Sequence, residues 1–266
     1  MLTDCHCHLD HHYYAKDLDK VIERARKAGV KAVITNGIDY ETNLISLQLA
    51  EKYGIVRPAL GFYPPDALNR ELYFEGIEHK TEKTFKDVLK QIEKNKDTII
   101  ALGEIGLDLY HGKDIESQKK VLFQLINLAV KLDKPVILHS RKAEAEILNL
   151  LEQTKINPQR VVLHCFSGRK SEIKRAIEKG YNFSIPTNIG RAENFKYLAE
   201  VCPISRILTE TDGPYLSPYK NEDNSFNRNE PAYVRESVKE IAKLKSLSEE
   251  KVEKQLYDNY LRVFGK

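Results

Sequence analysis

The sequence predicts an α/β fold, a single (β/α)8 TIM barrel in which residues 1–266 form one domain. The chain of 266 residues is close to the ~250 residues typical of this fold. Eight short, mostly apolar segments have the character of buried parallel strands. Each is followed by a segment with apolar residues at helical spacing, which is typical of strands joined by crossover helices. An open doubly wound sheet is the alternative, but it gives no reason for eight strands.

The first half of the chain contains four strands and four helices. In the first helix, Leu18, Val21, Ile22 and Ala25 recur at helical spacing, and Gly29 ends the helix. The strands are predicted within residues 2–9 and over 31–35, 55–60 and 98–102. The helices are predicted over 17–28, 40–53, 81–95 and 115–132.

The second half repeats this alternation. Gly180 ends a predicted helix in the same way as Gly29 does in the first half. The strands are predicted over 135–138, 160–163, 181–184 and 206–209. The helices are predicted over 143–153, 171–179, 192–201, 231–245 and 248–264.

Composition predicts a cytoplasmic protein with no membrane partner. No apolar run reaches about 18 residues, and the N-terminus lacks the pattern of a signal peptide. Cys5, Cys7, Cys165 and Cys202 are too few and too irregular for a disulfide framework, so we expect free thiols. The net charge of +3 neither establishes nor excludes a nucleic-acid substrate. The oligomeric state stays open.

A His-x-His pair lies on the first predicted strand. Side chains alternate along a strand, so His6 and His8 point to one face while Cys5 and Cys7 point to the other, towards the helices. Two imidazoles on one face suit a single metal ion but leave it short of ligands. A zinc knuckle made from the four residues is disfavoured, because side chains that alternate across a strand cannot converge on one ion. By itself, the pair is equally consistent with a surface strand.

Four further candidate ligands follow later strands, where the working groups of a (β/α)8 barrel lie. They are Glu104, His139, His164 and Asp212. Taken singly, His139 and His164 are better explained as buried, hydrogen-bonded side chains than as ligands. Their shared placement instead predicts two divalent ions at the C-terminal ends of the strands, of the kind Zn²⁺, Mn²⁺ or Mg²⁺. Glu104 would bridge the ions, with His6, His8 and Asp212 on one and His139 and His164 on the other.

Five segments together resemble one known family, the TatD family of metal-dependent hydrolases in the amidohydrolase-like superfamily. They occur in order from residue 4 to residue 214, and as a set they are highly specific: Asp4–Asp10, Gly103–Asp108, Pro135–Arg141, His164–Gly168 and Glu210–Pro214. The resemblance implies that the metal ligands are His6, His8, Glu104, His139, His164 and Asp212. It also implies deoxyribonuclease activity, and we expect a DNase of the 3′–5′ exonuclease type with DNA as its substrate.

The chain departs from the family in the loop after the third strand. Many members carry a histidine where this chain has Tyr63, and a phenol donates a hydrogen bond but does not shuttle protons near neutral pH. The predicted substrate contacts are Arg141, Tyr63, Asp108 and Ser167. Arg169 and Arg191 are outer cations, and the predicted stacking surfaces are Phe62, Tyr63, Phe166 and Tyr215.

The predicted reaction is hydrolysis by a water that the metal ions activate. Asp212 is the predicted general base, and Glu104 acts mainly by holding the ion pair. Two alternatives stay open. One is hydrolysis of a carbonyl substrate, such as an amide, a lactone or an aminoacyl ester. The other is a non-catalytic metal-binding subunit that binds nucleic acid.

Overall fold

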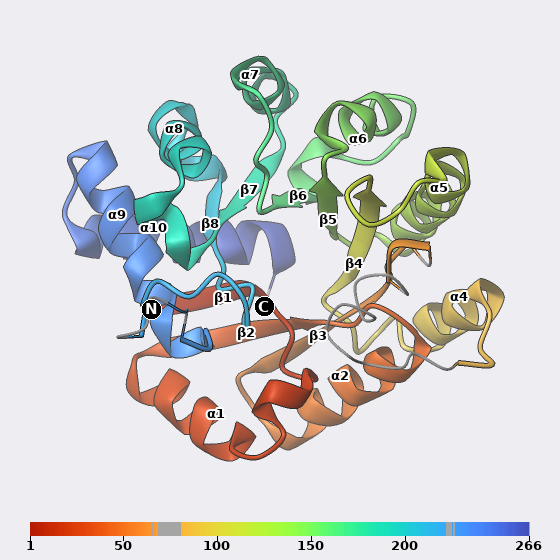
Figure 1. Ribbon diagram of the computed structural model, residues 1–266, viewed down its shortest axis with the longest axis horizontal. Helices are drawn as coiled ribbons and strands as arrows, with labels where there is room; N and C mark the ends of the chain where they lie inside the picture. Colours follow the sequence, from red (N-terminus) through yellow and green to blue (C-terminus); the bar gives the residue numbers. More distant parts are fainter. Residues whose placement is uncertain (65, 69–80, 222–224, 226, 266) are drawn as a thin grey trace.

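A computed structural model describes residues 1–64, 66–68, 81–221, 225 and 227–265. Eight strands lie in one sheet in the order β1 to β8, and each of the seven paired neighbours is parallel. Figure 1 shows the ring that these strands form. Their bounds are β1 Leu2–Cys7, β2 Val30–Asn36, β3 Val56–Phe62, β4 Ala101–Asp108, β5 Val136–Arg141, β6 Val161–His164, β7 Asn182–Ile185 and β8 Ile207–Thr209. The predicted (β/α)8 barrel is confirmed.

The helices surround the ring and alternate with the strands (Figure 1). Two of them begin with a capping box, in which Asp39 or Thr84 exchanges hydrogen bonds with the third helical residue. Their bounds are α1 Leu18–Lys27, α2 Tyr40–Lys52, α4 Phe85–Lys94, α5 Ile115–Leu132, α6 Glu144–Leu151, α7 Lys170–Glu178, α8 Glu193–Val201, α9 Arg235–Lys245 and α10 Glu249–Phe264. None of the helices within the described ranges is both long and apolar enough to cross a membrane.

Hydrogen bonds between the two ends of the sheet close the ring. The hydroxyl of Thr209 at the end of β8 donates to the carbonyl of Thr3 in β1 at 2.8 Å. Just beyond, the amide of Asp212 donates to the carbonyl of His6 at 2.9 Å, and the amide of His8 donates to the carbonyl of Gly213 at 2.8 Å. Segments about 200 residues apart in sequence are thereby fixed side by side.

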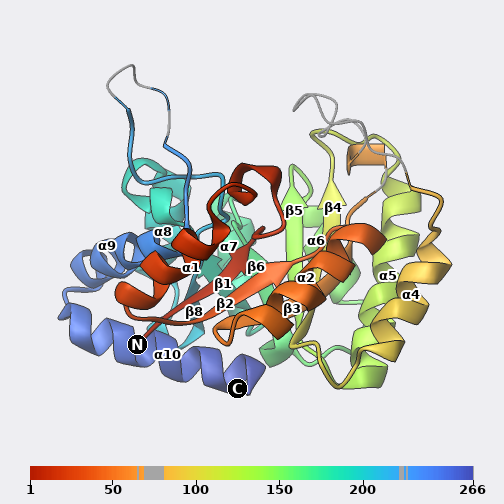
Figure 2. The same cartoon turned by 90° about the horizontal axis from the view of Figure 1, so that it is seen from below.

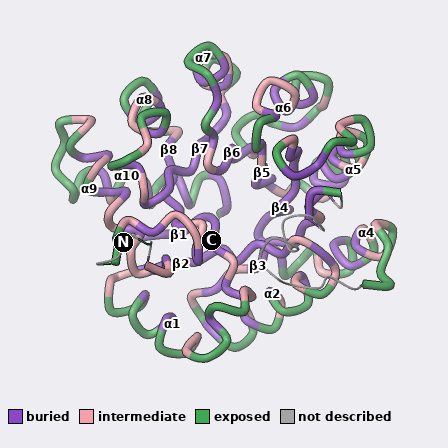
Figure 3. Tube along the Cα trace, viewed as in Figure 1, coloured by how far each residue is buried: buried purple, intermediate pink, exposed green. Residues whose placement is uncertain are grey.

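Apolar side chains form two main clusters. The larger lies between the strands and the surrounding helices. The smaller takes residues from seven of the eight strands together with Tyr260, Val263 and Phe264 of α10, so it fills the interior of the ring. Figure 2 shows α10 crossing the end of the barrel opposite the loops that follow the strands. Figure 3 shows the strands buried and the outer helix faces exposed. The end of the ring opposite α10 is left for polar side chains.

Two strands extend beyond their predicted ends far enough to include candidate ligands. β4 runs to Asp108 and β5 to Arg141, so Glu104 and His139 lie within strands instead of after them. The sequence predicts that the fourth strand ends at residue 102, so the glycines near Glu104 would begin a loop. In the structure these glycines let neighbouring strands lie close together. A Cβ at Gly61 would collide with the backbone of Glu104, and a Cβ at Gly106 would collide with the backbone of His139.

The predicted orientation of the two cysteines in β1 is right for Cys7 and wrong for Cys5. Cys7 packs in the cluster between strands and helices, whereas Cys5 belongs to the interior cluster. The register of β1 against β2 shifts between Asp4 and Cys7, and such an irregularity interrupts the alternation of side chains. All four cysteines are free thiols.

Candidate metal centre

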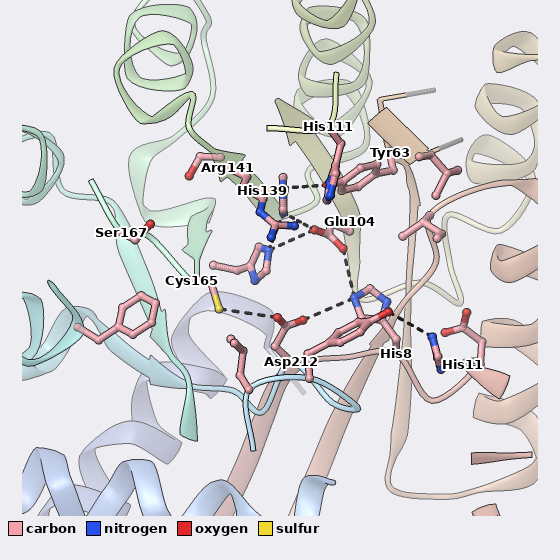
Figure 4. A pocket seen from close by; sticks show the side chains of 18 residues that line it. His8, His11, Tyr63, Glu104, His111, His139, Arg141, Cys165, Ser167 and Asp212 are labelled. Carbon is pink, nitrogen blue, oxygen red and sulfur yellow. Dashed lines mark hydrogen bonds and ion pairs between the residues drawn. The ribbon is translucent and has the colours of Figure 1, made fainter. Parts of the chain in front are cut away.

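The six predicted ligands converge at the C-terminal end of the strands. Five strands supply them: His6 lies in β1 with His8 directly after it, Glu104 in β4, His139 in β5, His164 at the end of β6 and Asp212 three residues after β8. Groups drawn from these six residues have donor atoms within 4.8 Å of one another. Figure 4 shows Glu104 between His139 and His8, with Asp212 on the side of His8.

The first half-site consists of His6, His8 and Asp212 around one oxygen of Glu104. The Nε2 atoms of the two histidines are 3.2 Å apart. They lie 3.5 and 3.3 Å from Oε2 of Glu104, and 3.5 and 3.7 Å from Oδ1 of Asp212. Four donor atoms therefore surround one point.

The second half-site consists of His139 and His164 around the other oxygen of Glu104. Nδ1 of His139 lies 2.7 Å and Nε2 of His164 lies 3.1 Å from Oε1 of Glu104. The two nitrogens are 3.2 Å apart. The carboxylate thus presents one oxygen to each half-site, which is the arrangement of a bridging ligand.

These distances fit metal coordination. With Zn–N bonds of 2.0–2.1 Å, neighbouring ligand atoms of a tetrahedral site are separated by about 3.3 Å. The separations in both half-sites lie near this value, and the donor set of imidazoles and carboxylates suits Zn²⁺ or Mn²⁺. Each pair of imidazole nitrogens is close enough either to share a hydrogen bond or to face one cation.

Outer groups hold two of the imidazoles in orientation. Nδ1 of His8 donates to the carbonyl of Asn36 at 3.1 Å, which leaves the Nε2 lone pair of the neutral ring facing the first half-site. Nε2 of His139 lies 3.4 Å from Oδ2 of Asp108, so its Nδ1 faces the second half-site. The hydroxyl of Tyr63 donates to the same oxygen of Asp108 at 2.6 Å and lies 3.0 Å from Nε2 of His139.

The carboxylates of the site have perturbed acidities. Burial would raise the pKa of Glu104, but the imidazoles of His6, His139 and His164 hold it well below its ordinary value. Burial raises the pKa of Asp212 to about 7, against the opposing effect of His164 and His8. Burial would also raise the pKa of Asp108, and hydrogen bonds from His139 and Tyr63 lower it below its usual range.

Sequence analysis did not identify Glu210 and Cys165 as site residues. Glu210 is fully buried and accepts hydrogen bonds from the amide of Cys165 at 2.9 Å and from the hydroxyl of Ser184. One of its oxygens lies 3.6 Å from Nδ1 of His164. Glu210, His164 and Cys165 form a further group of side chains that could hold a metal ion. The position of Glu210 directly after β8, two residues before Asp212, was the available signal.

A cavity of about 570 Å³, the site cavity, opens onto the half-sites. Arg141 lines it and is exposed, with its guanidinium carbon 4.5 Å from the centre of the Tyr110 ring. Ser167 also lines it, and its hydroxyl donates to Glu144 at 3.1 Å. Tyr63 lines the cavity as well, whereas Asp108 is fully buried behind His139 and is not a lining residue.

Two of the four predicted stacking surfaces are placed elsewhere. Phe62 packs against Phe85, and Phe166 is fully buried against Phe183, because both belong to the apolar layer under the helices. Tyr63 and Tyr215 do line the site cavity. The prediction rested on residue type in a loop, which does not reveal the direction of a side chain.

The two arginines predicted as outer cations, Arg169 and Arg191, are bonded to other residues of the protein. Arg169 forms an ion pair with Glu172 at 2.6 Å, and Arg191 donates to the carbonyls of Ser217 and Pro218 at 2.6 and 2.8 Å. Neither lines the site cavity. His11 and His111 do, although their loop positions had not marked them as candidates.

The fold and the site define the class of protein: a (β/α)8 barrel with a His, Glu and Asp cluster able to hold metal ions at the C-terminal ends of its strands. Within that class, the chain belongs to the TatD related DNase family, whose family model matches residues 3–265.

Relatives of the chain support this assignment along its whole length. It is 37% identical to human deoxyribonuclease TATDN3, covering 100% of this chain and 95% of that protein. It is 32% identical to an uncharacterized metal-dependent hydrolase of Methanocaldococcus jannaschii, covering 98% and 96% of the two chains. The crystal structure of the TatD homolog YjjV from Escherichia coli superimposes with a TM-score of 0.85 at 26% identity, covering 100% of this chain and 98% of that one.

Proposed function

We propose that this protein is a divalent-metal-dependent hydrolase that cleaves phosphodiester bonds of DNA and removes nucleotides from the 3′ end. The observation that carries the proposal is the placement of the two oxygens of Glu104, one in each half-site. A pair of cations bridged in this way suits in-line attack on a phosphodiester. The names of the human and archaeal relatives, a deoxyribonuclease and a metal-dependent hydrolase, agree with it.

The six convergent residues would hold two divalent ions, Zn²⁺, Mn²⁺ or Mg²⁺. Bound ions of this kind polarise the ester under attack and lower the pKa of water. Glu104 fixes the separation of the half-sites, because its two oxygens belong to one rigid carboxylate. The other five ligands then orient the site from both sides.

Asp212 is the proposed general base. Its Oδ1 faces His6 and His8, and it lines the site cavity, so a water held there is within reach of the carboxylate. Arg141 lines the same cavity and would neutralise a non-bridging oxygen of the phosphodiester.

The test combines metal content with cleavage of a labelled strand. Purified protein loaded with Mn²⁺ should contain two ions per chain by elemental analysis. It should shorten single-stranded DNA carrying a 5′ label by one nucleotide at a time. The variant Asp212→Asn should lose at least about a hundredfold in rate, while Asp258→Asn, an exposed carboxylate on α10, serves as the matched control.

Two results would contradict the proposal. Intact DNA alongside turnover of a lactone, an amide or an aminoacyl ester would assign the site to carbonyl chemistry. Equal rates for wild type and Asp212→Asn on DNA would show that the cleavage does not take place at this site.

A further inference from the structure

A second cavity of about 610 Å³, the side cavity, adjoins the site cavity. Tyr215 and Leu216 line both, so the two share a wall. On its other sides the side cavity is lined by Tyr13, Asn188, Arg191 and Arg228, among others. Its volume lies in the range of ligand-binding pockets.

Hydrogen bonds from neighbouring residues hold the shared wall, Tyr215 and Leu216, in place. The hydroxyl of Thr187 donates to the carbonyl of Leu216 at 2.9 Å, and Arg191 donates to the carbonyls of the next two residues. Tyr215 is fixed at its other end, where its hydroxyl lies 3.2 Å from Nε2 of His11. The wall is therefore already built without a bound molecule.

Tyr13 contributes an aromatic ring to the side cavity, and this ring contacts those of His11 and His12 at centroid distances of 4.6 and 4.3 Å. Tyr13 is 51% exposed, although it lines the cavity. Arg228 positions its backbone by donating to the carbonyl of Tyr13 at 2.6 Å, and Asp17 binds the same guanidinium at 2.7 Å. An exposed ring of this kind is a surface on which a nucleobase stacks.

Asn188 adds an amide. Its Oδ1 is buried and has no hydrogen-bond partner among the described residues. A buried acceptor of this kind is costly unless a ligand or water satisfies it. Nucleobase edges supply hydrogen-bond donors of the required type. The eight described lining residues include no carboxylate and two arginines, of which Arg228 is paired with Asp17.

We propose that the side cavity binds the nucleotide next to the one whose phosphodiester lies at the metal centre. This inference rests on the proposed function and extends it to the substrate class, a single-stranded DNA of at least two nucleotides. The base stacks on Tyr13 and bonds to Asn188, and the strand passes Tyr215 and Leu216 between the two cavities. The subsite predicts a preference for strands over single-nucleoside esters.

The test compares two substrates of the Mn²⁺-loaded protein. One is thymidine 5′-(p-nitrophenyl phosphate), which contains a single nucleoside, and the other is a thymidine tetranucleotide. Tyr13→Ala should raise the ratio of the tetranucleotide KM to the single-nucleoside KM about tenfold, while kcat for the tetranucleotide stays within about twofold. Tyr13→Phe, which keeps the ring, should preserve the wild-type ratio. Asn188→Ala should raise it about threefold.

Phe123→Ala is the matched control, because Phe123 is 40% exposed on α5, outside both cavities. An unchanged KM ratio in Tyr13→Ala would overturn the subsite while leaving the phosphodiesterase proposal intact. If wild type cleaves neither substrate, the proposed function fails, and binding of a fluorescein-labelled tetranucleotide decides the subsite separately. A dissociation constant about tenfold weaker for Tyr13→Ala supports it, and equal constants overturn it.

Discussion

The two half-sites have similar ligands but are supported in different ways. In the first, His8 is held by a backbone carbonyl, and Nδ1 of His6 has no hydrogen-bond partner among the described residues. In the second, carboxylates lie behind both imidazoles: Asp108 is 3.4 Å from His139, and Glu210 is 3.6 Å from Nδ1 of His164, which like Nδ1 of His6 has no hydrogen-bond partner among the described residues.

This difference predicts where the centre is sensitive to substitution. A carboxylate behind a ligating histidine fixes its orientation and raises its basicity. The second half-site therefore depends on side chains that do not themselves face the metal position. In the first, the orientation of His8 depends on a backbone carbonyl, which substitution does not remove. Variants of the supporting residues should affect the two half-sites unequally.

The largest effect is expected where the half-sites meet. Glu104→Ala removes an oxygen from both, so it should abolish binding of both ions and lower the rate of hydrolysis on the order of 10³-fold. Elemental analysis after gel filtration measures the first quantity and a DNA cleavage assay the second. Retention of two ions by this variant would contradict the bridging role.

A smaller and one-sided effect is expected from Asp108→Asn. The amide keeps the size of the side chain but loses the charge behind His139, so ion affinity in the second half-site should fall about 10- to 100-fold. The measurement is the Mn²⁺ concentration for half-maximal activity, with Asp258→Asn as control. An unchanged midpoint would remove the distinction between the half-sites.

Tyr63→Phe should act in the same direction but more weakly. It removes one hydrogen bond to Asp108, which corresponds to about a fivefold shift in the Mn²⁺ midpoint. The same variant separates two roles of the phenol. If Tyr63 acts by contacting substrate, KM for DNA rises and the Mn²⁺ midpoint stays at its wild-type value.

The smallest effect is expected from Asp17→Asn, directly before α1, because the ion-pair partners of Asp17 are Arg24 and Arg228 and not residues of either half-site. Arg228 and Arg24 lower the pKa of Asp17 to about 2, against a value of about 3.9 in an unfolded chain. Its ion pairs therefore add stability above pH ~4, and this contribution is lost as the pH falls towards 2. Calorimetry should show Tm lowered by less than about 3 °C at pH 7, because the pairs are partly exposed, and a smaller difference at pH 3. A difference that grows on acidification would contradict this assignment.

Much of the barrel could be predicted from the alternation of apolar strands and amphipathic helices. The convergence of the six candidate ligands was also predictable, since side chains at the same end of parallel strands must meet in a closed ring. The prediction that the two oxygens of Glu104 face two different groups of ligands also followed from the number of candidate ligands. The structure brings these atoms together as expected, whereas their role as ligands stays a prediction.

Features that depend on local irregularity were not predictable. The predicted fourth strand ends before Gly103, but in the structure β4 continues through Gly103 and Gly106, and the missing side chain of Gly106 lets β5 approach. The orientation of Cys5 was wrong because a register shift in β1 leaves no trace in composition. The side cavity, with Tyr13 and Asn188, is formed by the segments after β1, β7 and β8, whose conformation has no periodic pattern.

The hydrogen bonds that close the ring have a consequence for biosynthesis. The amide of Asp212 bonds to the carbonyl of His6, and the amide of His8 bonds to the carbonyl of Gly213. A nascent chain on the ribosome has the first two histidines from the start, but it has no partner for them until more than 210 residues have been made. The first half-site is therefore among the last parts of the barrel to be completed, and it should acquire its ion only late in translation or after release.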